Sequence, residues 1–341
     1  MKKLTIILFG MLLSGMPVFA QQDVHFSQFF SSPLTLNPAS AGIFDGDMRA
    51  IMNYRNQWSS ISEPYVTMAA SVDFPVLRKI NNGMFGMGIN FFKDAAGVSK
   101  LGTTNVGLSL AYHLDISGGQ KNNYLSVGFQ GGMVQRSMSL GNLTWDEQWN
   151  GVTFDQQIAT VDQLGATSAS VFDMGTGLHW YYMPKQNMNI FSGISLFHIT
   201  SPDIGFNGES PLLKKFTWHG GAEIPAGDDI SILPNAVFVK QGPNRYMDLG
   251  AEVKVFLQER TKFTNFRNPM YVTIGPYLRL GDALYLVSRF NWNGLAVAIS
   301  YDFNMSGLTT ATGGNGAYEL MLGYTANLNA NPTRGHSVRF H

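Results

Sequence analysis

Large apolar side chains alternate with small or polar ones along most of this chain, and the pattern limits the folds open to it. In 105–114, "NVGLSLAYHL", Val, Leu and Tyr occupy every second position, while Asn, Gly, Ser, Ala and His occupy the others. The segments 172–182, 246–257 and 294–303 repeat the pattern. A period of two describes a β-strand with one apolar face. Because the other face is small and polar, we expect strands between lipid and a hydrated lumen.

The composition also favours a membrane barrel. Charged residues make up 13% of the chain, against about 25% in soluble domains. After residue 20, no apolar run reaches the ~18 residues that a membrane helix needs. We therefore predict an all-β fold, a transmembrane outer-membrane β-barrel of about 14 antiparallel strands. A soluble periplasmic β-sandwich is the alternative that composition leaves open.

The expected strands are even in number, as in single-chain bacterial barrels, and most have the ~9–11 residues that cross a bilayer at a tilt. They lie at 48–57, 65–75, 84–93, 102–115, 123–136, 169–183, 188–199, 215–226, 229–241, 245–257, 270–280, 283–291, 294–304 and 316–326. If the first strand runs outward, the long polar connections fall outside and the tight ones face the periplasm. The segment 258–269 breaks that rule.

The N-terminus predicts export. Lys2 and Lys3 precede the apolar run "LTIILFGMLL", and Val18 and Ala20 occupy the −3 and −1 positions of a cleavage site. This is the pattern of a secretory signal peptide. The expected division is a signal peptide at 1–20, an extended N-terminal segment at 21–47, the barrel at 48–326 and a C-terminal tail at 327–341.

Patterns for catalysis, cofactors or metals are not found. The chain has no Cys, and its seven His lack metal-ligand spacing. No G-x-S-x-G elbow occurs. Lys+Arg and Asp+Glu both number 23, so no basic surface points to nucleic acid. We predict no enzyme activity, no cofactor and no nucleic-acid partner.

The stretch "HFSQFFSSPLTLNPASAG", residues 25–42, has neither strand nor helix periodicity. Pro33 and Pro38 favour an extended or turning path. Ahead of an outward first strand, the stretch should start in the periplasm, and its polar groups cannot face lipid unpaired. We expect it to fold into the lumen as a plug, with Gln28 and Asn37 bonded to lumen-facing groups, Arg55 among them. The alternative is an external docking strand for a periplasmic partner.

This stretch, followed by "RAIMNYRNQW", resembles the N-terminal motif of the PorP/SprF family of type IX secretion system membrane proteins. "GMGINFFKDAAGVSKLGTTNVGLSLAYHL", "YLRLGDALYL" and "GAYELMLGY" extend the resemblance over the mature chain. The tail "SVRFH" departs from it, with Ser337 where Cys is often found and His341 after Phe340. The motif residues carried over, as structural or partner-binding positions, are His25, Gln28, Asn37, Pro38, Ala39, Gly42, Tyr54, Arg55, Trp58, Asp94 and Gly97.

The resemblance implies a non-enzymatic outer-membrane component of the type IX secretion system. Such proteins support export or surface retention of large adhesins, as in gliding motility. The implied partners are the C-terminal domain of a secreted adhesin or cargo, the periplasmic ring lipoproteins and outer-membrane lipid. From the residues alone, a passive outer-membrane pore or hydrophobic-solute channel stays open, because about fourteen strands enclose a wider lumen than eight. An embedded enzyme is a third reading.

Overall fold

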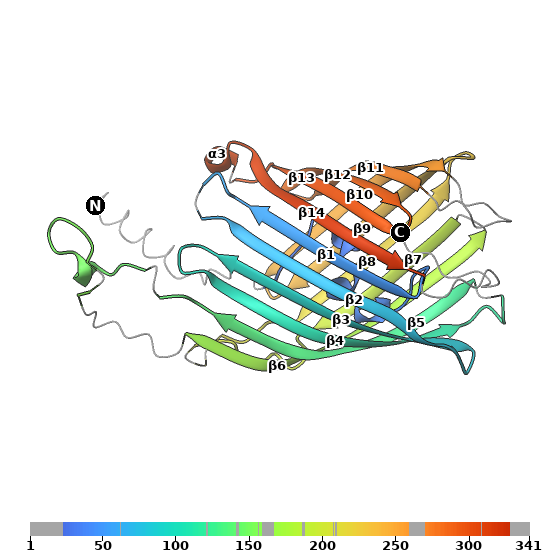
Figure 1. The fold of residues 1–341 in the computed structure, drawn as a ribbon, viewed down its shortest axis with the longest axis horizontal. Coiled ribbons are helices and arrows are strands. Elements are labelled where there is room, and N and C mark those ends of the chain that lie inside the picture. The colour runs from blue at the N-terminus through green and yellow to red at the C-terminus, as the bar shows by residue number, and fades with distance from the viewer. Residues whose placement is uncertain are drawn as a thin grey trace, which may run out of the picture.

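In the computed structural model, fourteen antiparallel strands close into a barrel (Figure 1). The structure describes residues 23–327 except 62, 121, 141–142, 156, 159–166, 186–187, 207, 209, 259–269 and 308. The strands are β1 (Met48–Gln57), β2 (Tyr65–Ile80), β3 (Gly83–Ala96), β4 (Leu101–Asp115), β5 (Asn123–Ser137), β6 (Ser168–Lys185), β7 (Met188–Phe197), β8 (Lys215–Pro225), β9 (Ile230–Gln241), β10 (Asn244–Gln258), β11 (Met270–Arg279), β12 (Ala283–Trp292), β13 (Leu295–Asn304) and β14 (Asn315–Ala326).

Each strand pairs with its neighbours in the chain, and β1 closes the ring against β14. Closure leaves no unpaired sheet edge, which a structure in lipid requires. All fourteen expected strands are confirmed. β2 runs to Ile80 rather than ending at 75, because register shifts after Pro75 let the strand continue past a residue without an N–H.

The two faces of the wall follow the predicted alternation. Val106 and Leu108 on β4 are exposed on the outside, while Asn105 and Ser109 are buried inside. A strand that presents apolar residues outward and small polar ones inward suits a barrel in lipid.

The connections divide the barrel into two ends. The connections 138–167, 198–214 and 305–314 lie at one end, which we call the loop end. At the opposite turn end, 81–82 and 293–294 are tight. This partition is the expected one. In Figure 1 the loop that carries the 3-10 helix η3 (Asp146–Gln148) extends well beyond the barrel.

Several expectations concern residues outside the described ones. These are the signal peptide at 1–20, most of the tail at 327–341, and nearly all of 258–269 between β10 and β11. Within the described ranges, no helix combines the length and apolar character that a membrane-crossing helix needs.

Residues 23–44, which we call the lumen segment, run inside the barrel. They form the short helices η1 (Phe29–Ser31), α2 (Pro33–Leu36) and η2 (Pro38–Ser40), visible in dark blue between the walls in Figure 1. Phe29 packs with Val237, Val239, Tyr277, Tyr285 and Val287 from β9, β11 and β12. The buried core of the molecule therefore lies between this segment and the inner wall.

The direction of the lumen segment differs from expectation. Asp23 contacts Lys215, the first residue of β8, at the loop end. Asp47 lies at the turn end, where its N–H donates to the Ala326 carbonyl at the end of β14 (2.8 Å). The segment therefore starts at the loop end, not at the turn end as expected for a periplasmic start, and reverses into β1. Its charged contacts at the loop end are the physical reason.

Candidate functional site: the lumen segment and the inner wall

Glycines on β3, β5 and β6 let the lumen segment lie directly on the wall. A methyl group added at Gly177 would stand 2.0 Å from Asn37 Oδ1, and one at Gly86 would stand 2.0 Å from the Ala41 carbonyl oxygen. At Gly128 it would meet the Ala39 nitrogen at 2.3 Å. Such distances exclude any side chain. We call Gly86, Gly128 and Gly177 the glycine patch.

Asn37 joins the segment to two strands of the wall. Its Nδ2 donates to the Leu178 carbonyl (2.9 Å) and the Ile194 carbonyl (3.2 Å), and lies 3.2 Å from His219 Nε2. Its Oδ1 accepts from the Ala39 N–H (2.9 Å), which caps η2. Pro38 follows as the first residue of η2, where a missing N–H costs nothing. Asn37, Pro38 and Ala39 therefore act as one unit.

The segment leaves the glycine patch through a turn held by Asp73. Gly42 has φ +77°, a left-handed conformation that glycine adopts without strain. Its N–H donates to Asp73 Oδ2 (2.8 Å). Arg49 Nη2 donates to the same oxygen (2.8 Å) and to the Ser40 carbonyl (3.3 Å). The motif residue Gly42 therefore lies at a turn.

A buried charged cluster holds the other half of the segment. Its members, Arg55, Asp248, Arg279, Asp302 and Glu319, come from β1, β10, β11, β13 and β14. Arg55 pairs with Glu319 across the closing strands and with Asp302 at 3.3 Å. Arg279 pairs with Asp248 at 3.2 Å and with Asp302 at 3.3 Å. Pairing offsets the cost of removing these charges from water.

The charged cluster grips the segment at Ser27 and Gln28. Glu319 accepts from the Ser27 N–H (2.6 Å) and the Gln28 N–H (2.9 Å). The Ser27 hydroxyl donates to Asp302 (2.7 Å) and accepts from Arg55 (2.8 Å). Gln28 Nε2 also lies 3.3 Å from Ser300 Oγ. Gln28 therefore lies in the lumen, whereas Arg55, expected as a partner of Gln28 or Asn37, bonds instead to Ser27 and His25 of the segment.

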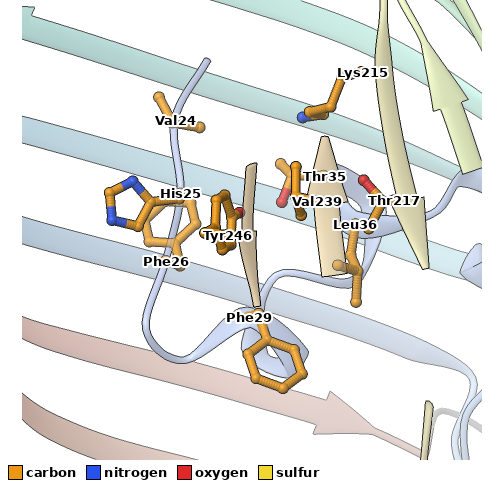
Figure 2. Close-up of a pocket in the computed structure, with 10 residues that line it drawn as sticks. All are labelled: Val24, His25, Phe26, Phe29, Thr35, Leu36, Lys215, Thr217, Val239 and Tyr246. Atoms are coloured by element: carbon orange, nitrogen blue, oxygen red, sulfur yellow. The ribbon is translucent and has the colours of Figure 1, made fainter. Parts of the chain in front are cut away.

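His25 lies beside the charged cluster and stays neutral. Arg55 Nη2 donates to His25 Nε2 at 3.3 Å, and the His25 ring lies 5.5 Å from the ring of Tyr246. Burial, with the positive charges of Arg55 and Arg279, lowers the pKa of His25 well below its ordinary value. His25 and Tyr246 line a cavity between the segment and β8–β10 (Figure 2). The cavity measures about 30 Å³, which has room for about a water molecule.

A second charged group, the loop-end cluster, holds the start of the segment. Asp23 pairs with Lys215 and with His198 Nε2 at 3.3 Å, and His198 Nδ1 lies 2.7 Å from Asp173 Oδ2. Burial opposes a charge on His198, but Asp23 and Asp173 outweigh it and raise its pKa to about 8. Burial raises the pKa of Asp23, but Lys215 and His198 outweigh burial and lower this pKa well below its ordinary value. His198 is therefore protonated at neutral pH.

The remaining motif residues contact other parts of the wall and its turns. Tyr54 lies with Tyr318 at a ring distance of 6.1 Å on the outer face, and Trp58 packs edge-on against Tyr65 at 5.2 Å beyond β1. Asp94 accepts a bond from Thr67. Gly97, at φ +68°, forms the β3–β4 turn, where its carbonyl accepts from the Lys100 N–H (3.0 Å).

Sequence reasoning missed the wall residues that hold the segment. Glu319, Asp302, Arg279 and Asp248 each occupy a position on the inward face of an apolar strand, and that isolated charge was the available signal. Within the described residues, no three His, Cys, Asp or Glu come together as a metal site. The arrangement is suited to holding polypeptide.

Comparison with solved structures returns outer-membrane barrels of low similarity. A FadL homologue of Pseudomonas aeruginosa is 10% identical, with a TM-score of 0.45 over 84% of this chain and 92% of that one. The toluene transporter TodX of P. putida is 9% identical, with a TM-score of 0.45 over 86% and 93%. Omp33 of Acinetobacter baumannii is 7% identical, with a TM-score of 0.41 over 82% and 98%. Among curated proteins, none matches the chain.

A family model covers nearly the whole chain. The model described as type IX secretion system membrane protein PorP/SprF matches residues 18–324. That range includes the lumen segment, the glycine patch, both charged clusters and the fourteen strands up to Tyr324 in β14. The chain is thus an outer-membrane β-barrel that belongs to the PorP/SprF family of type IX secretion system membrane proteins.

Proposed function

We propose that this chain is a non-enzymatic component of the type IX secretion system that supports export or surface retention of large adhesins. In this proposal, residues 1–20 direct export and are removed, and the barrel of 48–326 stands in the outer membrane with its loop end outside. The chain binds the C-terminal domain of cargo and, at the turn end, the periplasmic ring lipoproteins. Family membership supports the secretion role.

The filled lumen is the observation that best supports a function through protein partners. Ser27, Leu34, Asn37 and Ala39 are fully buried within the barrel. The cavity beside His25 measures about 30 Å³, whereas sites for small organic molecules measure about 300–1,000 Å³. A passive pore or hydrophobic-solute channel would require the lumen segment to leave. The occupied lumen therefore favours action through protein contacts.

A preformed hairpin at the loop end offers a surface for such a contact. Trp149 and Phe154 pair as an antiparallel bridge with their rings edge-on at 5.1 Å. Val152 at the tip is 85% exposed. The loop carries Asp146 and Asp155, and the sequence has no Lys or Arg between residues 136 and 185. Aromatic anchors are typical of binding hot spots, and the acidic loop suits a basic protein face better than anionic lipid.

Deletion of the gene in its native bacterium tests the proposal. We expect large adhesins to disappear from the cell surface, and the wild-type gene to restore them. A variant with Trp149→Ser and Val152→Ser should restore the barrel but not the surface adhesins. Ile61→Ser, which removes another exposed apolar side chain at the loop end, is the matched control and should restore both. Normal surface display in the deletion strain would refute the secretion role.

A further inference from the structure

The inner wall recognises the main chain of the lumen segment rather than only its side chains. Wall side chains from β1, β2, β4, β5, β7 and β14 bond to its amides and carbonyls. These bonds are Glu319 to the Ser27 and Gln28 N–H groups (2.6 and 2.9 Å), Asn53 to the Ser31 carbonyl (3.1 Å), Gln130 to the Leu34 carbonyl (3.3 Å), Ser195 to the Leu36 carbonyl (2.7 Å), Arg49 to the Ser40 carbonyl (3.3 Å), His113 to the Ala41 carbonyl (2.8 Å) and Asp73 to the Gly42 N–H (2.8 Å).

The barrel ladder is complete without the lumen segment. β1 pairs with both β2 and β14, so the ring closes through the strands alone. Within the part of the chain that the structure describes, residues 23–44 add no strand to that ring. Side chains and packing therefore hold the segment, much as they would hold a ligand. If the segment leaves the lumen, every hydrogen bond between the strands stays intact.

Contacts with the wall define what the site accepts. Leu34 is fully buried beside Ala41 and Ala111, so this position takes an apolar side chain. Asn37 fills the space above Gly177. Ala39 is fully buried with its main chain against Gly128, so a larger side chain at this position would overpack the interior. Residues 24–44 contain no Asp, Glu, Lys or Arg. In the charged cluster, Arg55 and Arg279 are already paired with Asp248, Asp302 and Glu319, so an anionic occupant would meet no free cation there.

We infer that the inner wall is a polypeptide-binding site for an uncharged segment of short helical turns with the pattern apolar-x-x-Asn-Pro-small. The chain's own residues occupy the site, and a segment of a secreted partner with the same chemistry takes their place. Main-chain bonds hold any sequence, whereas the Asn37 pocket and the small-residue positions select among sequences. This inference goes beyond the secretion role, because the site is defined by the wall and not by the identity of the cargo.

Peptide binding to the full chain tests the inference. The protein carries Asn37→Ala, which weakens its own occupant, and is refolded in detergent. The probe is a fluorescent synthetic peptide of residues 23–44 with the wild-type sequence. Because Asn37 donates to two carbonyls of the wall, we expect this peptide to bind at least about tenfold more tightly than an Asn37→Ala peptide. A Thr35→Ala peptide is the matched control, since the Thr35 hydroxyl bonds only within the segment, to Ser32, and should bind like wild type.

Two results would overturn the inference. One is equal binding of the wild-type and Asn37→Ala peptides, or no binding of either, to a chain whose barrel has folded. The second comes from hydrogen exchange of the unmutated protein, which does not depend on any variant folding. The Ser27 and Gly42 amides should exchange before the amides of the strand ladder. If the Ser27 and Gly42 amides and the strand amides exchanged in one cooperative step, the segment could not leave the wall while the barrel stays folded. Either failure would leave the deletion phenotype, and so the secretion role, standing.

Discussion

The lumen segment is held by two different kinds of wall. The charged cluster of β1, β10, β11, β13 and β14 bonds to Ser27 through paired ions. Opposite it, the glycine patch of β3, β5 and β6 receives residues 37–41 by shape, with main-chain atoms at the wall's surface. The first wall binds the segment through charged side chains, whereas the second lets the segment approach closely because its glycines have no side chains. The difference predicts that the two walls fail in different ways.

The charged cluster should give the largest loss when one partner is removed. Glu319→Gln takes from Arg55 its partner across the closing strands and leaves a buried charge underpaired. We expect a loss of roughly 3–5 kcal/mol in the free energy of unfolding, measured by urea titration in detergent. The double variant Arg55→Met with Glu319→Leu removes both charges, and should lose less than Glu319→Gln alone. A larger loss in the double variant would contradict the charge account.

A side chain added at the glycine patch should lower the free energy of unfolding through crowding. Gly128→Ala places a methyl group 2.3 Å from the Ala39 nitrogen, and main-chain atoms cannot turn aside. We expect a loss of about 3 kcal/mol, the upper end of the cost of overpacking. Gly131→Ala on the same strand is the control, because its nearest neighbour is the Phe172 side chain at 3.3 Å. Equal losses in the two variants would show that the segment does not press on the patch.

The loop-end cluster should make stability depend on pH. The pKa of His198 in the folded protein is raised from 6.5 to about 8. Its stabilising effect is therefore complete below pH 6.5 and is lost as pH rises through 8, and a shift of this size corresponds to about 2 kcal/mol. Urea titrations at pH 6 and pH 9 measure it. His198→Gln should abolish the difference, and an unchanged pH dependence in that variant would assign it to other groups.

Between the two walls, Thr35 should matter least. Its hydroxyl bonds to the Ser32 carbonyl at 2.9 Å and to the Ser32 hydroxyl at 2.7 Å, both within the segment. We expect Thr35→Ala to lower the free energy of unfolding by about 1 kcal/mol or less. A loss as large as that of Gly128→Ala would mean that a third region of the wall also holds the segment.

The strands could be predicted because their signal is local. Alternation in 105–114 or 294–303 requires only that neighbouring residues face opposite sides, which the backbone fixes. The direction of the lumen segment could not be predicted in this way. It depends on Asp23 meeting Lys215, and these residues are brought together only when the ring has closed.

The candidate site was predictable on one side only. Gln28, Asn37 and Arg55 were expected in the lumen, and the structure places them there. The wall residues Glu319 and Arg279 carry no motif, because a single inward charge on a strand becomes a site only beside the strands that face it. The glycine patch could not be predicted either, because the need for glycine at 128 and 177 arises only from the lumen segment packed against them.

Electrical conductance tests most directly whether residues 23–44 close the barrel. The full chain and a variant lacking residues 25–42 are inserted separately into planar lipid bilayers, after each is shown to be a folded barrel by heat-modifiable migration. We expect the full chain to carry no steady current and the deletion variant to conduct continuously. Equal conductance of two folded barrels, whether both open or both closed, would contradict it.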